Sequence, residues 1–243
     1  MSVKWHEGRV IENRHWTDSA FSLRVEGPKL TFRAGQFVRI ALEENLARAF
    51  SFVNPPHDPT LEFYGIVVPE GPLSPRLARL RAGDRLRVAS NPAGFLVLSE
   101  VPASARSLWL VSTGTGIAPF LSILQTDEPW RRFENVVLVH AVRHTAELVY
   151  QEMIRQISTE HGLRIVTFVS REAAPGSLGG RIPAAIRDGR LERAAGLALD
   201  HEAHLMLCGN PDMLRDAQAA LGERGLRKHR RRNPGHISVE SFW

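Results

Sequence analysis

The chain has 243 residues, 43% hydrophobic and 23% charged, which is typical of a globular protein with one large domain or two of ordinary size. No run approaches the roughly 18 apolar residues of a membrane span, and a single cysteine, Cys208, excludes an internal disulfide and a cysteine-ligated iron–sulfur cluster. The start of the chain, with Lys4, His6 and Glu7, has no apolar signal region, so we expect a cytoplasmic protein that does not enter a membrane.

The formal charge of +5 comes from one place. The run Arg227 to Arg232 holds five of the 31 lysines and arginines, and without it basic and acidic residues are equal in number at 26. Such a local patch indicates either a docking surface for an acidic partner or the solvated face of a helix. It argues against a nucleic-acid-binding protein, because no aromatic residues alternate with the basic ones.

Short strands separated by turn residues are expected up to about residue 100. They cover residues 8–12, 20–25, 36–42, 48–53, 61–67 and 85–89. Strands of this spacing predict an antiparallel β-barrel or sandwich. One helix is expected at 74–80, with Ser74 as its N-cap residue and Pro75 at its first position.

From Ser107 onward, strands alternate with helices. The expected strands are 108–112, 135–141, 163–170, 203–209 and 237–243, and the expected helices 117–125, 146–158, 182–187 and 211–221. This alternation predicts a parallel sheet covered by helices on both faces. We therefore expect two domains, an antiparallel β-barrel at residues 1–100 and a parallel-sheet α/β nucleotide domain at residues 107–243.

The run from Leu108 to Phe120 predicts a buried strand, a glycine turn and the start of a helix. Gly114 and Gly116 have no Cβ, so a diphosphate can approach the main-chain N–H groups there. The spacing Gly-x-Gly-x-x-Pro departs from the Gly-x-Gly-x-x-Gly fingerprint, so the turn alone fits a dinucleotide site and an ordinary strand-to-helix turn equally well.

Four separated segments resemble the ferredoxin–NADP⁺ reductase family, in the family's order and over essentially the whole chain. They are Arg48-Ala49-Phe50-Ser51, similar to the flavin motif Arg-x-Tyr-Ser; Gly114 to Pro119, similar to the nicotinamide-nucleotide loop; Cys208-Gly209-Asn210-Pro211-x-Met213, similar to the second nucleotide motif; and the terminal pair Phe242-Trp243, similar to the short bacterial form. The resemblance implies that the barrel binds FAD and that the α/β domain binds NADPH.

In the family pattern Arg48 pairs with the flavin diphosphate, Phe50 lies against the isoalloxazine ring, and Ser51 hydrogen-bonds near its reactive nitrogen. Phe50 stands where the family has tyrosine, so the stack is kept and a hydroxyl is lost. The other FAD-binding residues that the resemblance implies are Ala49, Tyr64, Gly65, Ile66, Val67, Pro72, Leu73, Ser74, Thr115, Phe242 and Trp243.

The resemblance also implies three catalytic residues, Ser51, Cys208 and Glu240, of which the last two position the nicotinamide. Without the resemblance, Cys208 is a buried thiol at a strand end and Glu240 a solvated charge. The implied NADP-binding residues are Gly114, Gly116, Arg143, Ser170, Arg171, Arg181, Gly209, Asn210 and Met213. The histidines, His140 and His144 among them, show no metal-ligand spacing, so we expect no metal.

A preference for NADPH is expected from the ends of two strands. An NAD site usually has Asp or Glu about 20 residues past the glycines, but this chain has Arg143 and His144 there. Ser170-Arg171-Glu172 ends the next strand, and Arg181 follows the Gly179-Gly180 turn. Three guanidiniums and a hydroxyl would suit a 2′-phosphate; alternatively, some of these arginines pair with surface carboxylates.

The function that the resemblance implies is FAD-dependent electron transfer between NADPH and a one-electron protein carrier, ferredoxin or flavodoxin. The alternative on the same scaffold is an NAD(P)H-dependent flavin reductase or the reductase component of an oxygenase. We expect a monomer whose acidic carrier docks on Arg227 to Arg232.

Overall fold

The structure, a computed structural model, describes residues 3–241, so Phe242 and Trp243 lie outside the described residues. The chain forms two compact units. The first comprises Met1–Val97 and Ala118–Thr126, and the second Leu98–Ile117 and Asp127–Trp243. The segment 118–126 thus belongs to the first unit, although the pattern of alternating elements assigns it to the second domain.

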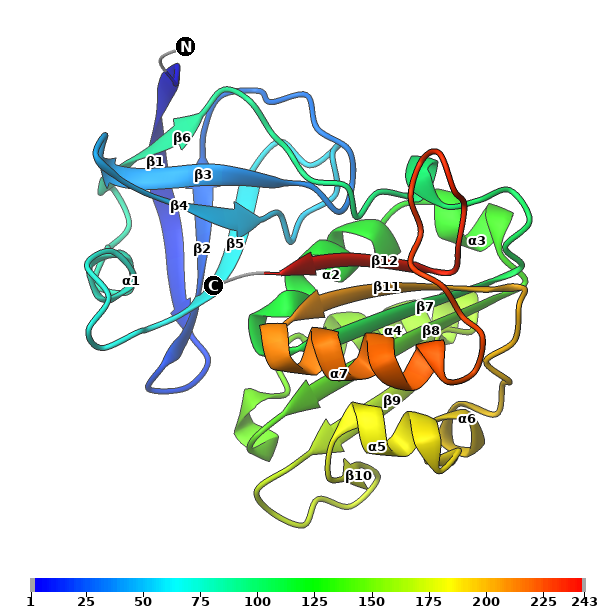
Figure 1. The fold of residues 1–243 in the computed structure, drawn as a ribbon. Coiled ribbons are helices and arrows are strands. Elements are labelled where there is room, and N and C mark those ends of the chain that lie inside the picture. The colour runs from blue at the N-terminus through cyan, green and yellow to red at the C-terminus, as the bar shows by residue number, and fades with distance from the viewer. Residues whose placement is uncertain (1–2, 242–243) are drawn as a thin grey trace. The chain divides into compact units, whose positions relative to one another are not determined.

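Six antiparallel strands form the first unit (Figure 1): β1 (Trp5–His15), β2 (Ala20–Glu26), β3 (Phe37–Glu43), β4 (Leu46–Ser51), β5 (Leu61–Ile66) and β6 (Arg85–Ala89), in the order β4-β3-β6-β1-β2-β5. The outer strands meet just past Ser51, where Phe52 and Phe63 form an antiparallel bridge and the Val53 N–H donates to the Glu62 carbonyl at 2.9 Å. The sheet closes on itself there, which confirms the antiparallel barrel and rules out a two-sheet sandwich.

Aromatic rings fill the barrel near this closure. Phe52 stacks on Phe32 with ring centroids 3.9 Å apart and lies 5.6 Å from Phe63. All three side chains are buried, and aromatic residues contribute the largest apolar areas to a core. The closure is therefore a packed structural centre next to the expected flavin motif.

Two helices complete the first unit. α1 (Ser74–Leu77) is a single turn, and the expected role of Ser74 as N-cap is wrong: Leu73 occupies that position, and the Ser74 hydroxyl accepts a hydrogen bond from the Val68 N–H at 2.9 Å. α2 (Ala118–Leu124) is entirely buried. Its Ser122 hydroxyl donates to the Asn54 carbonyl at 2.7 Å, which fixes the helix to the barrel.

Six parallel strands form the sheet of the second unit: β7 (Ser107–Thr113), β8 (Asn135–Val142), β9 (Arg164–Val169), β10 (Leu178–Gly179), β11 (Ala203–Gly209) and β12 (Ile237–Ser241), in the order β10-β9-β8-β7-β11-β12. Every residue of β11 and all but the last of β7 are buried. Strands buried on both faces are typical of a parallel sheet covered by helices, as expected.

The helices of this unit are α3 (Glu128–Arg132), α4 (Gln151–His161), α5 (Ile182–Arg187), α6 (Arg190–Ala195) and α7 (Pro211–Gly222). Figure 1 shows α5 and α7 in front of the sheet and α4 behind it. Residues of α5, α6 and α7 share one hydrophobic core with the strands. Short 3₁₀ turns lie at η1 (Leu98–Glu100), η2 (Gly114–Ile117) and η3 (Thr145–Glu147).

Several expected elements differ in detail. The helix expected from Ala146 begins only at Gln151, because Tyr150 takes a left-handed conformation with φ 57° and separates α4 from η3. The short helix α6 was not expected; Gly189 and Gly196, at φ 74° and 60°, bound it. The basic run is not the solvated face of a helix, because Arg230 and Asn233 exchange two main-chain hydrogen bonds in a tight turn.

Within residues 3–241, none of the helices combines the length and the apolar character needed to span a bilayer.

Candidate functional site

In the first unit, the barrel closure brings Phe50 of β4 against Gly65 of β5. A Cβ on Gly65 would stand 2.9 Å from Cε1 of Phe50, closer than real contacts allow. The Phe50 ring also lies edge-on to Phe63, with centroids 6.4 Å apart. Two segments that the resemblance assigns separately to FAD thus meet at one face, and Gly65 leaves the room that the ring occupies.

Ser51, the next residue, is 5% exposed. Its hydroxyl has no hydrogen-bond partner among the described residues. Most buried polar groups have a hydrogen-bond partner, so a buried hydroxyl without one is suited to a hydrogen bond with a polar atom of a ligand.

Arg48 is exposed, and its guanidinium donates to the Ala47 carbonyl at 2.9 Å. In the part of the chain that the structure describes, it has no ion pair with a carboxylate. Period-two alternation places Arg48 and Phe50 on one side of β4, and Ala49 and Ser51 on the other. The strand therefore offers a cation and an aromatic ring on the same side.

The expected FAD residues from Tyr64 to Ser74 lie on β5, on the loop that follows it and at the start of α1. Tyr64 and Gly65 are buried, Ile66 and Val67 partly buried, and the Val67 N–H donates to the Ser19 carbonyl at 2.7 Å. Farther along, Leu73 is buried and Pro72 exposed. The bond between Ser74 and Val68 closes this loop.

In the second unit, the turn after β7 packs main chain against main chain. A Cβ on Gly116 would stand 2.5 Å from the Cys208 carbonyl oxygen, and one on Gly209 only 2.2 Å from Oγ1 of Thr113. Gly209 also has φ 132°, which side chains disfavour. Gly116 and Gly209, one from each nucleotide motif, are therefore required by the close approach of the two segments.

Thr113 joins the same two motifs and was not among the expected site residues. Its Oγ1 accepts a hydrogen bond from the Asn210 N–H at 2.9 Å. The only signal in the sequence is its place directly before Gly114. Thr115, which was expected at the FAD, lies partly exposed in η2.

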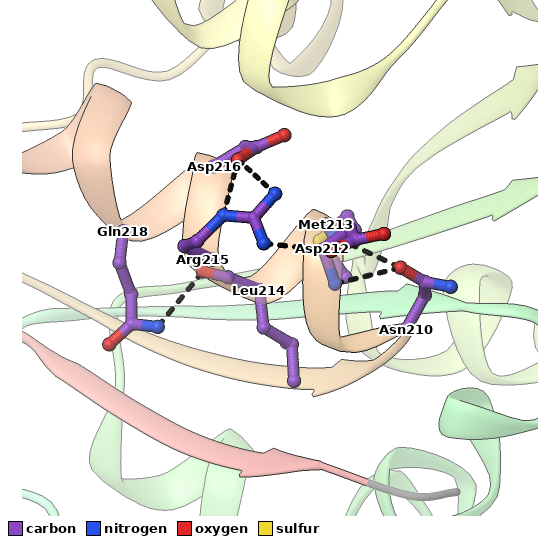
Figure 2. A network of polar contacts seen from close by, with 7 residues as sticks. All are labelled: Asn210, Asp212, Met213, Leu214, Arg215, Asp216 and Gln218. Carbon is purple, nitrogen blue, oxygen red and sulfur yellow. Dashed lines mark hydrogen bonds and ion pairs between the residues drawn. The ribbon is translucent and has the colours of Figure 1, made fainter.

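Asn210 caps α7, as Figure 2 shows. Its Oδ1 accepts from the N–H groups of Asp212 and Met213 at 2.9 and 3.1 Å. In the next turn Arg215 pairs with Asp212 and Asp216 at 2.8 and 3.1 Å. The cap fixes where α7 begins and thereby positions the segment from Cys208 to Met213.

Cys208 and Glu240 stand side by side in the register of β11 and β12. Burial, and after it the charge of Glu240, raises the pKa of the Cys208 thiol well above its usual value. Cys208 is therefore a neutral thiol at neutral pH, suited to packing and positioning and not to nucleophilic attack.

The three expected arginines lie at the carboxyl ends of three neighbouring strands, β8, β9 and β10. The Arg171 N–H donates to the Arg143 carbonyl at 2.9 Å, and Val169 is in register with Gly179, two residues before Arg181. All three are exposed, and none has an ion pair among residues 3–241. Ser170 lies between them, its hydroxyl donating to the Val142 carbonyl at 3.2 Å.

Glu172 is the carboxylate nearest to these arginines in the sequence, and it is bound elsewhere. It accepts from the Thr145 N–H at 2.6 Å and from Nδ1 of His144 at 3.3 Å. These hydrogen bonds, that of the Thr145 N–H first, lower the pKa of Glu172 to about 2. Glu172 therefore has no ion pair with Arg171 among the described residues.

No cluster of three or more His, Cys, Asp or Glu side chains within the described residues is suited to a metal ion.

An antiparallel barrel is followed by a parallel-sheet unit with a glycine turn, and residues 110–219 match the family model of the oxidoreductase NAD-binding domain, which places the chain among the nucleotide-dependent oxidoreductases. The chain is 51% identical over 246 residues to the flavodoxin/ferredoxin–NADP reductase of Shigella flexneri, covering 98% of this chain and 99% of that one. It is 39% identical to the ferredoxin–NADP reductase of Pseudomonas aeruginosa, covering 96% and 95%.

Among solved structures, the ferredoxin NADP⁺ reductase of Neisseria gonorrhoeae with bound FAD and NADP superposes with a TM-score of 0.94 at 34% identity, covering 99% of both chains. The chain belongs to the flavodoxin/ferredoxin–NADP reductase family.

Proposed function

We propose that this chain is an FAD-dependent reductase that transfers electrons between NADPH and a one-electron protein carrier, ferredoxin or flavodoxin. Its family and the full-length likeness to a relative with bound FAD and NADP support this function. The main structural support is the group of exposed arginines Arg143, Arg171 and Arg181 at adjacent strand ends. None of them has an ion pair within residues 3–241. The proposal assigns FAD to residues 1–100 and NADPH to residues 107–243.

The residues present fit an FAD. Phe50 offers a half-exposed ring, Ser51 a buried hydroxyl without a partner among the described residues, and Arg48 a cation for the diphosphate. The other residues proposed to hold it are Ala49, Tyr64, Gly65, Ile66, Val67, Pro72, Leu73, Ser74, Thr115, Phe242 and Trp243. When bound, FAD accepts a hydride and passes its two electrons on singly.

The NADPH site is proposed at the carboxyl ends of the parallel strands. Arg143, Ser170, Arg171 and Arg181 would bind the 2′-phosphate, because planar guanidiniums bind phosphate oxygens in pairs. The turn of Gly114 and Gly116 and the segment of Gly209, Asn210 and Met213 would hold the rest of the dinucleotide. Cys208 and Glu240 would orient the nicotinamide, the thiol as a small neutral group and the carboxylate as a fixed charge.

The carrier is proposed to dock on the basic turn, residues 227–232. Arg231 is held by Glu100, with two N–O distances of 2.7 and 2.8 Å. Arg227, Lys228, Arg230 and Arg232 are exposed and have no ion pair within residues 3–241. A cluster of free cations favours an acidic carrier and steers it from a distance at low salt. A monomer in the cytoplasm is part of the same proposal, and the single cysteine fits a reducing compartment.

The first test is the purified protein itself. We expect a yellow preparation with one FAD per chain, and a flavin spectrum that changes on titration with NADP⁺ and much less with NAD⁺. A colourless protein that does not take up added FAD, or one that binds both nucleotides equally, would contradict the proposal.

A further inference from the structure

His140, near the carboxyl end of the inner strand β8, is not among the residues proposed to bind FAD or NADPH. Its side chain is 1% exposed, and its Nε2 lies 3.1 Å from the Gly114 carbonyl oxygen. A carbonyl only accepts, so Nε2 carries the hydrogen and donates it. Burial lowers the pKa of His140 to about 4, so the ring is neutral at neutral pH.

Gly114 differs from Gly116 in what surrounds it. Apart from its chain neighbours, no heavy atom of residues 3–241 lies within 4 Å of the place where a Cβ on Gly114 would stand. The residue has φ 52°, a left-handed conformation that glycine adopts readily. The hydrogen bond from His140 restrains this peptide.

The direction of the carbonyl decides the direction of the next N–H. The peptide between Gly114 and Thr115 is trans, so its C=O and N–H point in opposite directions. Because the Gly114 carbonyl points toward His140 in the sheet, the Thr115 N–H points away from His140.

We propose that His140 is a positioning residue, which acts through the Gly114 peptide to present the main-chain N–H of Thr115 to the bound nicotinamide dinucleotide, while the Thr115 side chain remains the group proposed at the FAD. This inference rests on the proposed function, since it needs the glycine turn to be the nucleotide site. His140 itself touches neither nucleotide nor flavin; it fixes a donor that would otherwise rotate with the flexible glycine.

The test compares His140→Leu, which removes the donor, with His140→Gln, which keeps an N–H donor. The matched control is His204→Leu: His204 is also 1% exposed, on neighbouring β11, but its Nε2 bonds Oγ of Ser238 at 3.0 Å and not the glycine turn. The measurement is the equilibrium Kd of each variant for NADP⁺ and for adenosine 2′,5′-bisphosphate, followed by the flavin spectrum or by calorimetry.

We expect His140→Leu to weaken NADP⁺ binding about ten-fold, equivalent to ~1.4 kcal/mol. His140→Gln should recover most of that loss, His204→Leu should bind like the wild type, and the bisphosphate, which lacks nicotinamide, should bind all four proteins alike. Unchanged NADP⁺ affinity in His140→Leu, or an equal loss for both ligands, would overturn the inference. A wild type that binds neither ligand would instead refute the proposed function.

If His140→Leu does not fold, Gly114→Ala tests the same peptide by changing the residue that accepts the hydrogen bond. The new Cβ meets open space but opposes φ 52°. It should weaken NADP⁺ binding and leave the bisphosphate unaffected, and unchanged NADP⁺ affinity would contradict the proposal.

Discussion

The two units build their candidate sites by different means. In the first, the site consists of side chains around the barrel closure, with the Phe50 ring against Gly65 and the Ser51 hydroxyl buried on the other side of β4. In the second, main-chain segments meet so closely that neither Gly116 nor Gly209 has room for a Cβ. We therefore expect the first site to respond to the loss of a single functional group, and the second to respond to whatever moves its backbone or its strand-end charges.

The largest effect is expected in the first unit. Phe50→Ala should weaken FAD binding by about 3 kcal/mol, roughly 100-fold, because it removes the aromatic surface proposed to lie against the ring. Phe50→Tyr should retain FAD, since it keeps the ring and restores the family's hydroxyl. The FAD content of the purified variants and the Kd for added FAD measure this. Equal retention in the two variants would remove Phe50 from the flavin site.

A lower pH should destabilise the second unit more than the first. Burial lowers the pKa of His140 to about 4 and that of His204 to about 3, and both lie in the second unit. Between an ordinary histidine pKa of 6.5 and these values, the unfolded chain binds a proton that the folded chain does not, so stability falls as the pH drops.

From pH 7 to pH 5 we expect His140 alone to lower the free energy of unfolding by about 2 kcal/mol. Urea unfolding of the wild type and of His140→Leu at both pH values measures this, and the variant should lose correspondingly less stability on acidification. An identical loss in both proteins would show that His140 is not buried in its neutral form.

Arg171→Ala tests the strand-end charges. Removing one guanidinium should raise KM for NADPH about ten-fold, equivalent to ~1.4 kcal/mol, with little change for NADH. Arg187→Ala is the matched control, because that exposed arginine pairs with Glu223 at 3.0 Å and lies at the other end of α5 from Arg181. A proportional loss of both nucleotides would place Arg171 at the part of the cofactor that they share.

The smallest effect is expected at the basic turn. Changing Arg230, Arg231 and Arg232 to glutamine should slow electron delivery to an acidic carrier roughly three- to ten-fold at low salt and flatten its salt dependence. NADPH oxidation with a small artificial acceptor should stay unchanged. Arg231→Gln combined with Glu100→Gln should change little, since these two side chains already neutralise each other. If both activities fell together, the turn would have a structural role.

The architecture could be predicted because its signals are local. Period-two strands before residue 100 and alternating strands and helices after Ser107 specify a barrel and a parallel sheet, and the bounds of β6 and α5 were predicted without error. The three arginines could also be grouped, because the carboxyl ends of parallel strands share one edge of a sheet. Contacts between residues that are far apart in the sequence gave no such signal: that Phe50 meets Gly65, or that His140 reaches Gly114, depends on register across the strands.

Electron transfer to a protein carrier is best measured by steady-state reduction of ferredoxin, flavodoxin and free flavin, side by side, with NADPH as the donor. We expect efficient reduction of at least one carrier protein that falls as salt is added, and slow, salt-insensitive reduction of free flavin. Reduction of free flavin that outpaces both carriers would contradict the proposed function and would favour a flavin reductase on the same scaffold.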